Sequence, residues 1–170
     1  MTEADILSAL DEAVAEPALA RHLESVVPIL EERLRVDPVA IMAWEPIPLD
    51  TYRRLPAEIR SSWVFILRAG ITTGAERHPN SHQRMVSYRG AGEFPSQVDG
   101  EWESRPLSSD RSRPIADRWV SIPPLTWHQG IVDPAQNWVV VSFHTVPAEE
   151  LIEERPADEG GVQQKLYVKG

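Results

Sequence analysis

The sequence predicts a mainly β protein, a sandwich or barrel of short strands that follows an N-terminal helical region. Three observations support this fold class. Short apolar, β-rich runs recur from residue 62 onward, with turn residues between them. The 15 prolines are typical of turns and strand edges rather than of long helical bundles. Before residue 37, by contrast, apolar residues recur at helical spacing.

Composition restricts the class of protein. At 170 residues the chain is long enough for one hydrophobic core and short for two. Hydrophobic residues make up 42% of the chain and charged residues 25%, as in soluble globular proteins. A net charge of −9 argues against binding nucleic acid or an anionic membrane, because both need clustered Lys and Arg. The chain has no cysteine, which excludes disulfides, thiolate metal sites and a cysteine nucleophile.

The N-terminus and the hydropathy pattern predict where the protein is found. No apolar run reaches the roughly 18 residues that a membrane-spanning helix needs. The first residues, MTEADILSALDEA, are acidic and lack the basic segment of a secretory signal. We therefore expect a cytoplasmic protein without a membrane partner.

The N-terminal region, residues 2–36, is predicted to be helical. Thr2 is a suitable N-cap for a first helix, and Pro17 either separates that helix from a second one or begins the second. In residues 18–35 apolar side chains recur at i, i+4 and i+7 or i+8, which is typical of an amphipathic helix. This stripe is expected to pack on the core or to form a dimer contact.

The rest of the chain is predicted to be strands and loops. Residues 37–60 contain four prolines and are predicted to form an irregular linker with at most a short helix near 56–60. The polar segment 104–118 is predicted to be a mobile loop and a candidate lid, and a short helix is expected at 148–155. Strands are expected at residues 63–67, 83–88, 97–102, 119–122 and 137–146. Asp99-Gly100 is a strong hairpin signal within one of them.

Two segments carry polar residues at regular spacing. In the first, Gly70, Glu76, His78, Gln83 and Gly90 are separated by five, one, four and six residues. In the second, Asp117, Pro123, Leu125, His128 and Val132 are separated by five, one, two and three.

With these two segments the chain resembles the cupin superfamily. Cupins carry G-x5-H-x-H-x3,4-E-x6-G and then G-x5-P-x-G-x2-H-x3-N. Here Glu76 and Gln83 replace the first His and the Glu of the first motif, and Asp117, Leu125 and Val132 replace Gly, Gly and Asn of the second. The resemblance covers roughly residues 62–146 and implies a double-stranded β-helix, or jelly-roll, barrel with a site inside it.

The resemblance, together with the helical start of the chain, implies a division into three parts. We expect an N-terminal helical extension packed on the barrel at 1–60, a cupin barrel at 61–147 and a C-terminal extension at 148–170. A homodimer is expected from the apolar N-terminal stripe and from the habit of cupins.

The implied site is a variant metal centre. Residues two apart in a strand face the same side, so Glu76 and His78 can both point into the barrel, with His128 arriving from a distant strand. Two imidazoles and one carboxylate suit one divalent transition metal, with Fe(II) favoured and Mn, Ni, Co or Zn as alternatives. Gln83 is a weak fourth ligand or a donor that orients a ligand. His82 is an alternative third ligand in place of Glu76.

Two further residues are candidates for binding a substrate. Arg89 is in phase with Gln83 on the predicted strand, so its guanidinium can face inward and bind a carboxylate. Trp127 precedes His128 and can form an apolar wall of the pocket.

These residues lead to several functional hypotheses. The leading one is a metal-dependent enzyme that acts on a small molecule, most closely resembling the cupin dioxygenases. The alternatives are a non-enzymatic cupin that binds or senses a small ligand, and a cupin-type isomerase or epimerase. A 2-oxoglutarate oxygenase is disfavoured, because the order here is Glu-x-His and residues near 138 offer no Arg. No hydrolase motif or phosphate-binding loop is present.

Overall fold

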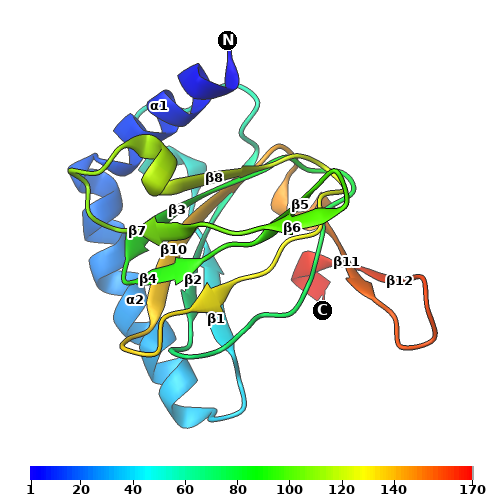
Figure 1. Ribbon diagram of the computed structural model, residues 1–170. Coiled ribbons are helices and arrows are strands. Elements are labelled where there is room, and N and C mark those ends of the chain that lie inside the picture. The colour runs from blue at the N-terminus through cyan, green and yellow to red at the C-terminus, as the bar shows by residue number, and fades with distance from the viewer. Residues whose placement is uncertain (170) are drawn as a thin grey trace.

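A computed structural model, which describes residues 1–169, arranges the chain in three layers (Figure 1). Two helices cover one face of a five-stranded antiparallel sheet, and a smaller sheet lies on its other face. The helices are α1 (Glu3–Val14) and α2 (Pro17–Val36). The large sheet has the order β1 (Met42–Pro46), β2 (Ser61–Leu67), β10 (Trp138–His144), β3 (Gln83–Arg89) and β8 (Trp119–Ile122).

The remaining strands are short. A three-stranded sheet has the order β7 (Pro106–Ser108), β4 (Ala91–Glu93) and β9 (Ile131–Val132). Two hairpins complete the structure: β5 (Ser96–Val98) with β6 (Glu101–Glu103), and β11 (Ile152–Pro156) with β12 (Val162–Leu166). Single 3-10 turns lie at Leu49–Thr51, Ala148–Glu150, Ile115–Asp117 and Tyr167–Lys169. The mainly β fold with an N-terminal helical region is as predicted.

The helices begin where the sequence predicts. The Thr2 hydroxyl accepts a hydrogen bond from the Asp5 backbone N–H, and the Asp5 carboxylate accepts one from Thr2, which forms a capping box. Pro17 occupies the first turn of α2, where the missing N–H costs nothing. Among the described residues, no helix combines the length and apolar composition that crossing a bilayer requires.

Both faces of the large sheet are buried. Val141 and Phe143 of β10 pack with Leu10 of α1 and the apolar face of α2. The alternate residues of β10, including Trp138 and Val140, pack on the small sheet. Because successive side chains point to opposite faces, β10 carries one core on each side. The face that bears Trp138 and Val140 is therefore the barrel interior.

The structure corrects three local predictions. Residues 37–60 contain β1, an edge strand that tolerates Pro46 because its outer side has no strand partner. The segment 104–118 contains β7 and a 3-10 turn rather than only a loop. The helix expected at 148–155 is a single 3-10 turn followed by β11.

The other predicted strands are present, and so is the hairpin. Asp99 and Gly100 both have positive φ, as a tight two-residue turn requires. The three-part division at residues 60 and 147 stays a prediction. The large sheet nevertheless begins before residue 61, because β1 pairs with β2.

Candidate metal centre

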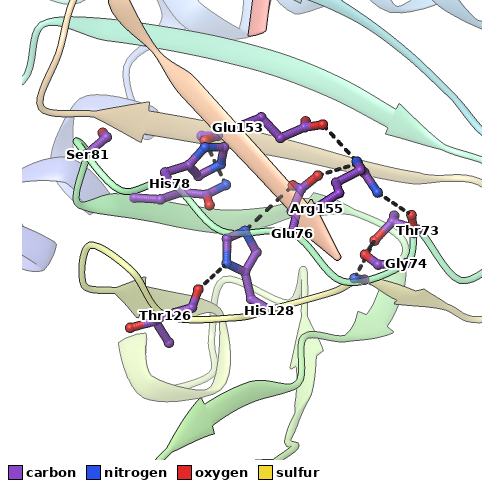
Figure 2. A network of polar contacts seen from close by, with 12 residues as sticks. Thr73, Gly74, Glu76, His78, Ser81, Thr126, His128, Glu153 and Arg155 are labelled. Atoms are coloured by element: carbon purple, nitrogen blue, oxygen red, sulfur yellow. Dashed lines mark hydrogen bonds and ion pairs between the residues drawn. The ribbon is translucent and has the colours of Figure 1, made fainter. Parts of the chain in front are cut away.

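Backbone pairing brings the segment between β2 and β3 against the segment between β8 and β9. The Glu76 N–H donates to the His128 carbonyl and the His128 N–H donates to the Glu76 carbonyl, each at 2.9 Å. Two residues joined by such reciprocal bonds in an antiparallel pair project their side chains to the same side. His78 lies two residues beyond Glu76 and faces the same interior space (Figure 2).

The three predicted ligands converge. The nearest ligand atoms of Glu76, His78 and His128 all lie within 4.8 Å of one another, and His128 Nε2 is 3.6 Å from Glu76 Oε1. His78 and His128 are buried, whereas the Glu76 side chain is 14% exposed. The spacing is suitable for three ligands of one ion.

Hydrogen bonds determine which nitrogen of each imidazole is free. His78 Nδ1 lies 2.8 Å from the Ile152 carbonyl and His128 Nδ1 lies 2.9 Å from the Thr126 carbonyl. A carbonyl only accepts, so both Nδ1 atoms carry a proton, and in the neutral form of each imidazole the lone pair is on Nε2. Buried His128 Nε2 has no hydrogen-bond partner among the described residues. This donor set fits a metal ion, since metal-bound histidines typically donate their second N–H to a carbonyl.

The ionisation states also suit a cation. Burial opposes ionisation of Glu76, but the neighbouring His128, His78 and Arg155 outweigh it and hold the pKa of Glu76 below its ordinary value. Burial, together with the nearby His128, lowers the pKa of His78 to about 4. At neutral pH the site therefore offers a carboxylate and a neutral imidazole, the forms that bind metals.

Arg155, which the sequence analysis did not single out, contacts the same carboxylate. Its Nη2 donates to Glu76 Oε2, its Nε donates to Glu153 Oε1 at 2.7 Å, and its Nη1 donates to the Thr73 carbonyl at 3.2 Å (Figure 2). Arg155 lies on β11, where a helix was expected. An alternating-strand pattern over 152–156 would have placed Glu153 and Arg155 on one face and is the signal that could have found them.

Gln83 lies in a buried polar network beside the three ligands. Its Nε2 donates to Ser142 Oγ at 3.4 Å, and Ser142 Oγ lies 3.0 Å from His144 Nε2. The His144 ring is perpendicular to the His78 ring, with centroids 5.1 Å apart. His144 is buried in the barrel interior, because Val141 and Phe143, which are out of phase with it, face the helices.

His82, the alternative ligand, lies outside this cluster. Its Nε2 is 2.8 Å from Ser121 Oγ and 3.9 Å from Glu3 Oε1, so the ring faces α1. His82 and Gln83 are adjacent on an extended segment, and adjacent side chains point to opposite faces of the sheet.

The structure gives Arg89 and Trp127 partners other than the three ligands. Arg89 forms an ion pair with Glu31 of α2 and is half exposed, which corrects the expectation that it faces inward. The cause is a β-bulge between Ser87 and Arg89, which reverses the alternation at the end of β3. The Trp127 ring lies 4.6 Å below the Arg77 guanidinium.

Aromatic rings line the two histidines. Phe94 stacks on His128 with ring centroids 5.5 Å apart. Tyr167, which follows β12, contacts the His78 ring at a centroid distance of 6.1 Å and packs on Trp63. Burial, with the Glu76 and Glu153 carboxylates nearby, raises the pKa of Tyr167 well above its ordinary value. The phenol therefore keeps its proton at neutral pH.

The chain matches no family model, and no curated protein matches it. Among solved structures, coconut allergen cocosin is similar to it, with 14% identity and a TM-score of 0.51. Pumpkin seed globulin matches with the same two values. Both globulins are cupins. This chain has the cupin fold.

Each cupin match covers 67% of this chain and 28% of the globulin chain. The chain therefore corresponds to less than a third of the length of either globulin. The predicted superfamily resemblance is confirmed at the level of the fold. The fold supports many unrelated functions, so the activity depends on the residues in the barrel.

Proposed function

We propose that this cupin is a metal-dependent enzyme that acts on a small molecule, most similar to the dioxygenases among the cupins. Convergence of Glu76, His78 and His128, with both Nδ1 atoms donating to carbonyls, is the observation that carries the proposal. Fe(II) is the expected metal, because two imidazoles and a carboxylate leave positions for other ligands. Mn, Co, Ni and Zn accept the same donors.

Each surrounding residue has a role in this proposal. Glu76, His78 and His128 hold the ion, and the Ile152 and Thr126 carbonyls orient the two imidazoles. A bound metal would supply Lewis-acid or redox chemistry to a substrate. Gln83, whose Oε1 is buried without a hydrogen-bond partner among residues 1–169, supplies an acceptor at the edge of the site.

Elemental analysis of untagged protein, purified without a chelator, tests the site. We expect about one transition metal per chain in the wild type, and loss of the metal in Glu76→Gln and His128→Gln. A carboxylate or imidazole ligand contributes several kcal/mol of metal affinity, so the loss should be at least about 100-fold in affinity. His82→Gln is the matched control and should keep the metal, because its ring faces α1.

Other outcomes would contradict this assignment. Loss of metal in His82→Gln with retention in Glu76→Gln would move the site to three histidines. Absence of metal from the wild type, before and after reconstitution with Fe(II), Mn(II), Co(II), Ni(II) or Zn(II), would overturn the metalloenzyme.

A non-enzymatic cupin that binds a small ligand is the second candidate. One observation favours it: Arg155 already compensates the Glu76 carboxylate within the protein. Thermal stabilisation by a small ligand in metal-free protein would support this candidate. An isomerase or epimerase would use the same metal site and is distinguished by its product.

The assembly and location remain proposals. A homodimer is proposed from the apolar N-terminal stripe, although much of that stripe is used within the chain, where Leu23 and Leu30 pack on the sheet. Light scattering during gel filtration measures the oligomeric state directly. A cytoplasmic location is proposed from the N-terminal composition.

A further inference from the structure

The charged groups around the candidate metal centre balance one another. Glu76 and Glu153 both accept hydrogen bonds from Arg155, and the Lys165 ammonium lies 3.7 Å from Glu153 Oε1. These two carboxylates and two cations have no net charge. The neighbouring pair Arg77–Glu154 is balanced as well.

A divalent ion held by Glu76, His78 and His128 would change this balance. An imidazole that binds a metal is in its neutral form, so the ion would add two positive charges to a group that is already balanced. Uncompensated charge in a largely buried site is costly. The loaded centre therefore favours a ligand that carries negative charge.

Arg155 is more exposed than the three candidate ligands. The Arg155 side chain is 32% exposed and that of Glu76 is 14% exposed, whereas His128 is fully buried. The Arg155 side chain therefore lies nearer to solvent than the ligands beside it. Glu76 Oε1 faces His128 and Oε2 faces Arg155, so the guanidinium borders the metal position across one carboxylate (Figure 2).

Arg155 also has binding capacity left. A guanidinium has five N–H donors in a planar fork that matches a carboxylate. Three contacts, to Glu76, Glu153 and the Thr73 carbonyl, use three of them. The neighbouring Arg77 differs, because it pairs with Glu154 and stacks on Trp127.

We infer that the substrate class of this site is a small carboxylate, and that Arg155 is the residue that recognises its anionic group. This inference rests on the proposed function, since the charge argument requires the bound metal. It adds a specificity-determining residue from the C-terminal hairpin β11–β12, which lies outside the motifs that suggested the metal site.

Calorimetric titration of protein loaded with Co(II) tests the inference. The probes are acetate, glycolate and malonate, each compared with its uncharged amide. We expect at least one carboxylate to bind the loaded wild type more than about 10-fold more tightly than its amide, and more tightly than it binds metal-free protein. Arg155→Gln should weaken that binding at least about 10-fold with its Co(II) content unchanged. Arg89→Gln, which removes an exposed arginine paired with Glu31, should bind as the wild type does.

The outcomes separate this inference from the proposed function. A wild type that takes up no Co(II) overturns both. A loaded wild type that binds no probe, binds amides equally well, or loses no affinity in Arg155→Gln overturns the carboxylate inference alone. If Arg155→Gln loses the metal, Arg155→Lys tests whether Arg155 recognises the carboxylate. The lysine keeps the positive charge beside Glu76 but lacks the planar fork of the guanidinium. Weaker carboxylate binding by loaded Arg155→Lys supports recognition by Arg155, and wild-type affinity overturns it.

Discussion

Leu125 adopts a backbone conformation that its side chain disfavours. Its φ is 66°, in the left-handed region, and it stands where the second cupin motif has a glycine. Its N–H donates to the His78 carbonyl at 3.0 Å, so this conformation joins the segment before His128 to the segment that carries His78. The left-handed conformation at residue 125 is one that glycine adopts without steric cost and leucine does not.

Leu125→Gly is expected to stabilise the protein by about 0.5–1 kcal/mol. A non-glycine residue costs about 1–2 kcal/mol in the left-handed region, and glycine removes this cost. Glycine also raises the conformational entropy of the unfolded chain, which offsets about 0.4–1 kcal/mol of the gain. Little burial is lost, because Leu125 is 55% exposed. Urea denaturation measures the difference in the free energy of unfolding.

Leu49→Gly is the matched control for this change. Leu49 is also exposed, at 37%, but its φ is not positive. The free energy of unfolding of Leu49→Gly should be lower by about 0.5–1 kcal/mol, because no strain is relieved and only the entropic cost of glycine remains. A loss of stability in Leu125→Gly as large as in the control would refute the strain at Leu125.

At the scale of elements, two buried arginines attach α1 to the large sheet. Arg84 of β3 contacts Glu3 at 2.8 Å, and Arg118, which precedes β8, contacts Asp11 at 2.7 Å. Both arginines are almost fully buried. Burying a guanidinium without its partner is costly, so these pairs specify how α1 lies on the sheet.

Acid is expected to weaken the attachment of α1. Hydrogen bonding to Arg84, opposed by burial, lowers the pKa of Glu3 from 4.5 to about 2. Because the pKa is lower in the folded state, this stabilisation is complete above about pH 4.5 and is lost as pH falls toward 2. Urea midpoints between pH 7 and 2.5 should fall less steeply in Glu3→Gln than in the wild type.

Glu12→Gln is the control for the acid experiment. Glu12 lies on the same helix and forms no ion pair among the described residues. Its midpoints should follow the wild-type pH dependence. Equal slopes for Glu3→Gln and the wild type would show that Glu3 does not contribute to the loss of stability in acid.

At the scale of the whole molecule, the close approach of the two sheets depends on one glycine. A Cβ on Gly92 of β4 would lie 2.5 Å from the Trp138 ring and 2.6 Å from the Ile131 carbonyl oxygen. Trp138 is buried in the large sheet, with its Nε1 donating to Ser87 Oγ at 2.8 Å. It therefore has little freedom to move away.

Gly92→Ala is expected to destabilise the protein by about 1–3 kcal/mol through overpacking. Urea denaturation followed by tryptophan fluorescence measures the loss. Gly100→Asn serves as the control, because a Cβ there meets no atom within 4 Å and Asn tolerates positive φ. Its stability should change by less than about 0.5 kcal/mol. If Gly92→Ala lowers the free energy of unfolding by no more than this, the two sheets move apart around the added methyl group at little cost.

The local patterns of the chain predicted much of the fold. Apolar runs identified β2, β3, β8 and β10, and Asp99-Gly100 identified a hairpin. The period of two in Glu76-Arg77-His78, combined with motif spacing, identified three residues whose side chains converge. Such signals can be read from the sequence, because they depend only on neighbours within a few residues.

Other predictions failed where distant segments decide the outcome. Arg89 follows a bulge that the pairing of β3 with β10 creates, so its phase was misjudged. The sequence analysis did not single out His144, which faces the interior because both faces of β10 are covered, one by helices and one by the small sheet. Neither the bulge nor the second covering layer leaves a periodic signal in the sequence.

The sequence by itself determined that this is a mainly β cupin-like chain with helices at its start and Glu76, His78 and His128 as one group. Only the tertiary structure decided that β11 brings Arg155 to the Glu76 carboxylate, that His82 faces α1, and that Tyr167 covers His78. The reason is physical. Side-chain periodicity is encoded locally, whereas the contact between residues 79 positions apart depends on strand pairing and packing across the whole chain.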